Sequence, residues 1–139
     1  MKFIGLDAGS VSVKLVILDN KGDMLFKHYE RHKGYPLHVS LRLLKKVTGQ
    51  EGHKAEGPLM DPVVSSPHDF SLSVTGSAGR LIASVLGIKP VNEIVAQAYS
   101  TKILFPRIKT IIEMGGEDSK LIYLGEGSRS VQDFSMNKI

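Results

Sequence analysis

Two short stretches of this sequence combine residue types that could bind phosphate. Residues 5–14 read GLDAGSVSVK, and residues 113–120 read EMGGEDSK. In each stretch an apolar run leads into a carboxylate, Asp7 or Glu113, which is followed by glycine, small polar residues and a lysine. A tight turn of this kind exposes backbone N–H groups in a concave arrangement that binds phosphate oxygens. The sequence therefore predicts two phosphate-binding hairpins, 106 residues apart.

Glycine in such a turn lets the backbone approach an anion closely, and tight turns often require the positive φ that glycine tolerates. Ser10 or Ser12 could add a hydroxyl donor, and Lys14 or Lys120 could supply positive charge. The residues predicted to bind phosphate are Gly9, Ser10, Ser12, Lys14, Gly115, Gly116, Asp118 and Ser119. Neither stretch matches a Walker A loop or a GxGxxG dinucleotide turn. Each stretch alone could equally be an ordinary hairpin, and the prediction depends on the pair.

Asp7 and Glu113 are expected to face each other across the phosphates. Two bare carboxylates there would repel the anion and each other, and a divalent cation removes that conflict. Mg²⁺ prefers oxygen ligands, keeps several waters and is usually held by one or two carboxylates together with the phosphates themselves. We therefore predict Asp7 and Glu113 as metal residues that hold Mg²⁺ through water.

Length and composition are those of about one globular domain. The chain has 139 residues, of which 42% are hydrophobic and 23% are charged, and no apolar run approaches the ~18 residues of a membrane span. With no cysteine, the chain can form no disulfide and no thiolate metal site. The formal net charge is +4, but the basic residues are scattered, which favours solvated surfaces over a nucleic-acid site. We expect no membrane and no nucleic-acid partner.

Hydrophobic periodicity predicts an α/β order of elements. Expected strands cover residues 2–7, 11–19, 24–32, 70–75, 108–113, 119–124 and 129–134, and expected helices cover 36–48, 80–86 and 93–104. In the second helix we expect Leu81, Ile82, Val85 and Leu86 to be buried. Residues 50–68 show neither period and are expected to form a mobile loop. The opening strands recur near the end, so we predict a first lobe at 1–106 and the truncated start of a second lobe at 107–139.

Three further residues are weaker candidates for the cleft between the lobes. Thr75 and Gly76 precede a helix, and a helix N-terminus approached by small residues can bind an anion, although a plain strand-to-helix turn explains them equally well. Glu93 follows the capping residue Asn92, and a carboxylate in a first helical turn is favoured by the helix dipole whatever else it does.

The order of elements and the two hairpins resemble the actin-like ATPase fold of actin, sugar kinases and heat-shock ATPases, which is related to ribonuclease H. In that fold nucleotide lies between two lobes. Within it, several motifs look like the activator ATPases of 2-hydroxyacyl-CoA dehydratases and benzoyl-CoA reductases, and in particular the first activase unit of large fused members. The motifs that carry this resemblance lie at residues 5–14, 29–32, 75–80, 91–98, 111–120 and 133–138.

This resemblance implies a cytoplasmic, homodimeric ATPase that binds ATP or ADP with Mg²⁺. It implies that the whole protein receives an electron from a donor and passes it at low potential to a dehydratase or reductase, through a [4Fe-4S] cluster whose cysteines follow the Met136–Lys138 segment. It also implies that Asp7 and Glu113 are catalytic, with one of them orienting the attacking water. The chain stops before any cysteine, so we expect it to be a fragment that binds nucleotide at best and is by itself inactive.

Two departures leave the activity open. Single-unit activators usually carry aspartate where Glu113 stands and glutamine where Glu117 stands, which makes binding easier to expect than hydrolysis. A small-molecule kinase of the same fold could share both hairpins. An actin-like assembly module could use nucleotide only to set the angle between its lobes.

Overall fold

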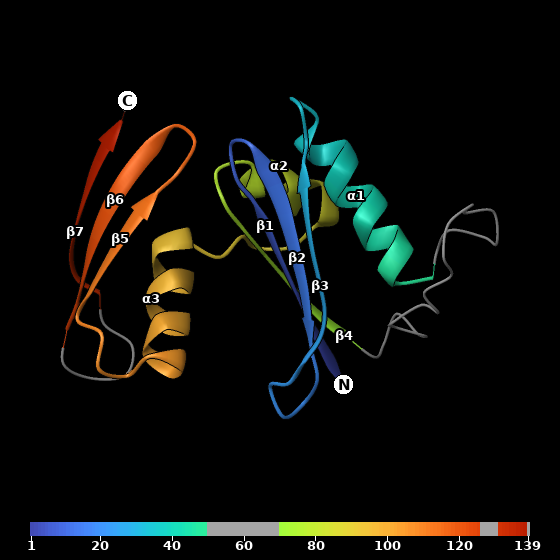
Figure 1. Ribbon diagram of the computed structural model, residues 1–139. Helices are drawn as coiled ribbons and strands as arrows, with labels where there is room; N and C mark the ends of the chain where they lie inside the picture. The colour runs from blue at the N-terminus through green and yellow to red at the C-terminus, as the bar shows by residue number, and fades with distance from the viewer. Residues whose placement is uncertain (50–69, 126–130, 139) are drawn as a thin grey trace. The chain divides into compact units, whose positions relative to one another are not determined.

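The computed structural model describes residues 1–49, 70–125 and 131–138, and its elements are shown in Figure 1. The elements run in the order β1 (Lys2–Ala8), β2 (Ser12–Leu18), β3 (Met24–Arg31), α1 (Pro36–Val47), β4 (Phe70–Thr75), α2 (Gly79–Leu86), α3 (Glu93–Leu104), β5 (Thr110–Met114), β6 (Asp118–Leu124) and β7 (Val131–Lys138). The order expected from the sequence is confirmed. The expected loop at 50–68 and the expected start of the last strand at 129 lie outside the described residues.

The chain divides into two compact units, Met1–Pro90 and Val91–Ile139. Helix α3 therefore belongs with the last three strands, whereas the sequence suggested a boundary after residue 106. The assignment of residues 1–106 and 107–139 to two lobes stays a prediction.

The first unit is a four-stranded mixed sheet in the order β3-β2-β1-β4. Strand β1 pairs antiparallel with β2 and parallel with β4. Helices α1 and α2 pack against each other and against this sheet (Figure 1). Because β1 and β4 are parallel, their carboxyl ends meet at one edge, and a ligand site in an α/β sheet typically lies at such an edge.

Alternating residues of β1, β2 and β4 supply the sheet's side of the core. The buried hydrophobic residues of this unit are Ile4, Leu6, Ala8, Val13, Leu15, Ile17, Val39, Leu43, Leu44, Val47, Val74, Ile82 and Ala83. At the rim, Arg42 of α1 donates to Glu30 of β3, and this hydrogen bond, together with one from His28, lowers the pKa of the Glu30 carboxyl. The ion pair fastens α1 to the strand that precedes it.

The buried face of α2 differs from the expected one. Leu81 and Val85 are more than half exposed, and the buried residues are Gly79, Ile82 and Ala83. A Cβ on Gly79 would lie 3.5 Å from the Val74 side chain, so the helix approaches the sheet through its small residues. The expectation followed the larger apolar side chains, whereas close packing selected the face that allows the nearest approach.

The second unit is an antiparallel sheet in the order β5-β6-β7 with α3 packed against it (Figure 1). Its core consists of Ile94, Ala98, Ile122 and Leu124. Val95, beside the buried Ile94, is about half exposed.

Helix α3 begins at a capped N-terminus, as expected. The Asn92 side chain accepts hydrogen bonds from the backbone N–H groups of Ile94 at 2.9 Å and Val95 at 3.3 Å. We expect Asn92→Ala to lower the free energy of unfolding of the second unit by about 1 kcal/mol, because it leaves both donors without this acceptor. Asn92→Ser keeps an acceptor and is expected to recover most of the loss. Urea denaturation, monitored through the amide hydrogen exchange of Ile122, would measure the free energy of unfolding of both variants. Equal losses in the two variants would contradict the capping role.

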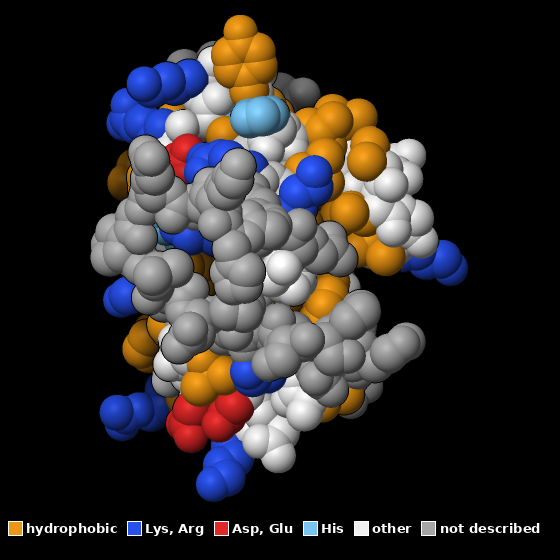
Figure 2. Space-filling view, turned by 90° about the vertical axis from the view of Figure 1, so that its right-hand side faces the viewer, with side chains coloured by type: hydrophobic (Ala, Val, Ile, Leu, Met, Phe, Trp, Pro, Cys, Tyr) orange, Lys and Arg blue, Asp and Glu red, His pale blue; other side chains and the backbone are white. Residues whose placement is uncertain are grey.

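Within the described residues, no helix is long and apolar enough to cross a membrane. Figure 2 shows that, on the face visible there, Lys and Arg side chains stand at separated places among hydrophobic ones.

Candidate functional site

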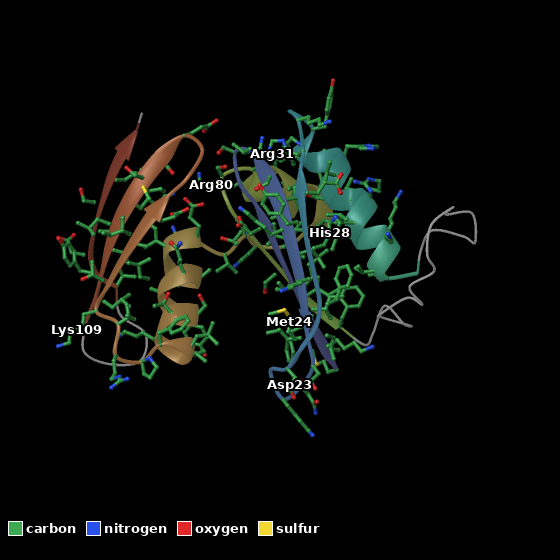
Figure 3. All side chains as sticks on the ribbon, viewed as in Figure 1. Asp23, Met24, His28, Arg31, Arg80 and Lys109 are labelled. Carbon is green, nitrogen blue, oxygen red and sulfur yellow. The ribbon has the colours of Figure 1, made fainter. Side chains whose placement is uncertain are left out.

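The first predicted hairpin is a tight turn at the carboxyl end of β1. Strands β1 and β2 stay in register up to the pair Ala8 and Val13, and the Gly9 N–H donates to the Ser12 carbonyl at 3.0 Å. Arg31, at the end of β3, lies at this end of the sheet because it pairs with Ser12. Asp23 and Met24 lie at the opposite end of β3 (Figure 3).

The turn directs its carbonyl groups into the protein. The Ala8 carbonyl accepts from the Ala78 N–H at 2.9 Å, and the Gly9 carbonyl accepts from the His32 ring at 3.2 Å. No described residue accepts a hydrogen bond from the backbone N–H of Ser10 or Val11. Unpartnered amide donors in a turn are the feature that an anion-binding nest requires.

Asp7 stands beside this turn and pairs with Lys14. Lys14 Nζ lies 3.0 Å from Asp7 Oδ2 across the β1–β2 ladder, and both side chains are about two-fifths exposed. One carboxylate occupies only one of the three ammonium donors, so Lys14 can also reach an anion at the turn. Between the two lysines considered from the sequence, the structure favours Lys14 for this role.

The turn between β4 and α2 closes over the same carboxylate. Thr75 pairs with Asp7 in the parallel register, and its buried hydroxyl has no hydrogen-bond partner among the described residues. Gly76 has φ +97°, and a Cβ built there would lie 2.4 Å from the Ala8 carbonyl oxygen and 2.5 Å from Asp7 Oδ1. Only glycine fits at this position. Thr75 and Gly76, weak candidates in the sequence, therefore belong to the Asp7 site.

Ser12 is a less suitable phosphate donor than Ser10. It is buried, and its hydroxyl forms a hydrogen bond with the Tyr29 phenol that, with a further one from Arg31, lowers the pKa of that phenol. Ser10 lies at the tip of the turn and is partly exposed.

The second predicted hairpin repeats the first residue for residue. Glu113 pairs with Lys120 as Asp7 pairs with Lys14, and Gly115 N–H donates to the Asp118 carbonyl at 2.8 Å. No described residue accepts a hydrogen bond from the N–H of Gly116 or Glu117. Each position of this hairpin lies 106 residues after its counterpart, so the repeated motif in the sequence corresponds to a repeated backbone geometry.

Lys120 differs sharply from Lys14 in its surroundings. Its side chain is 4% exposed, and Nζ lies 2.8 Å from Asp118, 3.1 Å from Glu93 and 3.2 Å from Glu113. An ammonium has three donors, so three carboxylates use all of them and none remains for a phosphate. Lys120 thereby brings Glu93 and Glu113 together, and the role of Glu93 in a cleft stays a prediction.

Burial and the three carboxylates act on Lys120 in opposite directions. Burial by itself lowers the pKa of the ammonium, and the hydrogen bonds to Asp118, Glu93 and Glu113 outweigh it, so the pKa stands above the ordinary 10.5. Lys120 is charged at neutral pH and holds the acidic side chains of this hairpin in place.

One residue that the sequence did not place in the site contacts the first hairpin. His32 is buried, and besides contacting the Gly9 carbonyl it accepts the Gly34 N–H at Nδ1, at 3.1 Å. Among the described residues, no group of three His, Cys, Asp or Glu side chains is arranged to hold a metal ion. A contact spanning 23 positions leaves no local pattern by which it could have been found.

The expectation of positive φ at the hairpin glycines is wrong. Positive φ occurs at Gly76 and not at Gly9, Gly115 or Gly116. In the second hairpin glycine serves a different need, because a Cβ on Gly115 would lie 3.0 Å from the Asp118 carboxylate. Close approach therefore explains Gly115, whereas positive φ is a reason for Gly76 after β4 and not for the hairpin glycines.

The chain was compared with known proteins. No family model matches it. The activator of lactoyl-CoA dehydratase from Anaerotignum propionicum is 29% identical over 138 residues, which cover 99% of this chain and 47% of that protein. The 2-hydroxyisocaproyl-CoA dehydratase activator from Clostridioides difficile is 29% identical over 137 residues, covering 99% and 46%. The (R)-2-hydroxyglutaryl-CoA dehydratase activating ATPase from Acidaminococcus fermentans is 22% identical over 135 residues, covering 96% and 46%. The chain is homologous to activators of 2-hydroxyacyl-CoA dehydratases. It spans about half the length of these curated relatives.

Solved structures of such activators share the fold. The crystal structure of the Acidaminococcus fermentans (R)-2-hydroxyglutaryl-CoA dehydratase component A matches with a TM-score of 0.72 at 20% identity, covering 99% of this chain and 48% of that one. The Clostridium difficile 2-hydroxyisocaproyl-CoA dehydratase activator, solved with bound ADPNP, matches with a TM-score of 0.69 at 26% identity, covering 99% and 46%. An exopolyphosphatase from Cytophaga hutchinsonii also matches, with a TM-score of 0.58 at 14% identity, covering 100% and 51%. The α/β actin-like ATPase fold expected from the sequence is confirmed.

Proposed function

We propose that this chain forms the phosphate-binding part of an ATP-hydrolysing activator of a 2-hydroxyacyl-CoA dehydratase. The observation that carries the proposal is the repeated hairpin, in which a carboxylate, a lysine and unpartnered turn amides occur at the same positions twice. We propose that the two hairpins face each other across the β- and γ-phosphates of a nucleotide. The residues around the phosphates would be Gly9, Ser10, Ser12, Lys14, Gly115, Gly116, Asp118 and Ser119, with donors supplied by Ser10, Lys14 and Gly116. Homology to dehydratase activators, one of them solved with ADPNP, supports this assignment.

A magnesium ion suits the residues present. Asp7 offers a half-exposed carboxylate of which only one oxygen is paired with Lys14, and Glu113 is about a third exposed. Oxygen donors and room for water are what Mg²⁺ requires, and Asp7 and Glu113 would hold it through water. Bound there, the ion would neutralise phosphate charge.

The chain's own groups would then act by position and charge. Lys14 would contribute a positive charge beside the phosphates, and the turn amides of Ser10 and Gly116 would donate to their oxygens. Either Asp7 or Glu113 would orient the attacking water. Phosphoryl transfer depends mainly on such positioning and charge neutralisation.

Electron transfer to the dehydratase belongs to the whole protein in this proposal, as do a homodimeric assembly, an electron donor and a cytoplasmic location. A [4Fe-4S] cluster does not fit the residues of this chain, because its usual ligands are thiolates and the sequence has no cysteine. Any such cluster would take its ligands from outside these 139 residues.

Calorimetric titration with Mg-ADP tests the nucleotide site. We expect binding in the millimolar range, weakened about tenfold by Asp7→Asn when Mg²⁺ is present but not weakened by that substitution in EDTA, where the bare carboxylate only repels the anion. Asp23→Asn is the matched control, because Asp23 is exposed and lies at the far end of β3 (Figure 3). Absence of heat from the unaltered chain at millimolar nucleotide would contradict the proposal, as would equal affinities for the two variants.

A further inference from the structure

We infer that His32 is a positioning residue that orients the Gly9–Ser10 peptide so that the Ser10 N–H points into the phosphate site. The inference rests on the proposed function, because it names the residue that prepares the first hairpin for its ligand. His32 lies outside both hairpins, directly after β3, and is 6% exposed.

The two contacts of His32 define its tautomer. A backbone N–H can only donate, so Nδ1, which receives the Gly34 N–H at 3.1 Å, carries no proton. In the neutral ring the proton is then on Nε2, which donates to the Gly9 carbonyl at 3.2 Å. Both ring nitrogens are thus used by backbone groups, and the ring is held between two turns.

Fixing the Gly9 carbonyl also fixes the next amide. The peptide bond is planar, and in its trans form the C=O and N–H groups point in opposite directions. No described peptide bond is cis. Because His32 draws the Gly9 carbonyl toward itself, the Ser10 N–H must point away from His32. That N–H has no acceptor among the described residues. It is therefore available to an external anion.

Without the His32 contact, the peptide between Gly9 and Ser10 could flip and exchange the directions of its C=O and N–H groups. Gly9 places little restriction on its side of the peptide, since it has no Cβ. The flipped orientation would present the Gly9 carbonyl oxygen to the phosphate, which repels it. The His32 contact therefore selects the orientation that binds an anion over the one that does not.

The backbone around His32 is strained in a way that serves this contact. Lys33 has φ +49° and Gly34 has φ +89°, positive values at both central positions of a turn that the Tyr35 N–H closes onto the His32 carbonyl at 2.8 Å. These values are typical of a type I′ turn. A positive φ at a lysine is unfavourable and persists where surrounding contacts require it. Here the turn brings the Gly34 N–H onto Nδ1 and so holds the ring toward Gly9.

A matched pair of variants separates the two ring contacts. The amide nitrogen of glutamine can take the place of Nε2 and still reach the Gly9 carbonyl, whereas asparagine can replace only the acceptor at Nδ1. We expect the Ser10 amide resonance to move in His32→Asn and to stay close to its original position in His32→Gln. With inorganic pyrophosphate as the probe, we expect affinity to fall about tenfold in His32→Asn and about twofold or less in His32→Gln. The Asp23 amide, at the far end of β3 (Figure 3), serves as an internal reference.

Each outcome of this experiment decides something. Unchanged Ser10 resonances and unchanged pyrophosphate affinity in folded His32→Asn would overturn the inference, and so would equal losses in both variants. Should His32→Asn not fold, a through-bond coupling between Nε2 of His32 and the Gly9 carbonyl carbon in the unaltered protein supports the inference if observed and overturns it if absent. A Ser10 amide that follows His32→Asn but ignores pyrophosphate in every protein would contradict the proposed phosphate site while upholding the orienting role.

Discussion

Replacing Lys120 by methionine is expected to lower the free energy of unfolding of the unit Val91–Ile139 by about 3 kcal/mol. The side chain would remain similar in volume, but three carboxylates that now share one buried ammonium would be left facing each other. We expect the lower end of the range for a broken buried ion pair because the carboxylates keep some contact with water. Amide hydrogen exchange at Ile122 and Leu124, both in the core of this unit, measures the loss.

Lys14→Met is the matched control for this prediction. Lys14 occupies the equivalent position of the first hairpin and also pairs with a cross-strand carboxylate, but it is exposed, so we expect a loss below about 1 kcal/mol. Nucleotide affinity should respond in the reverse order, since the exposed lysine is the one with donors to spare. Similar stability losses in the two variants would show that burial of Lys120 is not what makes its ion pairs important.

The pH dependence of the same unit follows from the direction of the pKa shift. The folded state raises the pKa of Lys120 above 10.5, so the stability that this group contributes is fully present below about pH 10.5 and is lost as the pH rises through the folded value. The difference in stability between the unaltered chain and Lys120→Met should therefore be constant from neutral pH to about pH 10 and shrink above it. A difference that instead fell between pH 6 and pH 9 would contradict the charged state assigned to Lys120.

Gly76→Ala is expected to destabilise the unit Met1–Pro90 by about 4 kcal/mol or to prevent its folding. Two penalties add: the positive φ of Gly76 costs an alanine about 1–2 kcal/mol, and the new Cβ would lie 2.4 Å from a backbone oxygen that cannot move without disturbing β1. Urea denaturation, monitored by circular dichroism and by the amide hydrogen exchange of Leu6 and Val74, measures the loss in the free energy of unfolding.

Gly87→Ala isolates the first of these penalties. Gly87 also has positive φ, at +68°, but an added Cβ there would meet nothing within 4 Å. We expect a loss of about 1 kcal/mol, which is the cost of the backbone conformation alone. If Gly76→Ala were no more harmful than Gly87→Ala, the close approach of the β4–α2 turn to Asp7 would be disproved.

The order of elements could be predicted because each carries a local signal. Alternation marks β2 and β4, Pro36 and Asn92 mark helix starts, and the repeated motif marks both hairpins. The inward face of α2 could not be predicted, because Leu81 and Val85 are as apolar as the buried Ile82. What decides between them is the close approach of Gly79 to Val74, a contact between elements.

In the candidate site, too, local patterns could be predicted and contacts between elements could not. The hairpin residues were found because carboxylate, glycine and lysine recur at fixed spacing. The contacts of His32 with Gly9 and of Lys120 with Glu93 were not found, because they join residues more than twenty positions apart. The different tasks of Lys14 and Lys120 also depend on burial, which the shared pattern of carboxylate, glycine and lysine does not reveal.

The central claim is that both hairpins bind one nucleotide through their turn amides. Recording ¹H–¹⁵N spectra of the chain during a titration with Mg-ADP tests it directly. The account predicts that the amides of Ser10 and Val11 in the first turn, and of Gly116 and Glu117 in the second, shift together and fit a single dissociation constant. Shifts confined to one turn, or two turns that saturate at different concentrations, would contradict it.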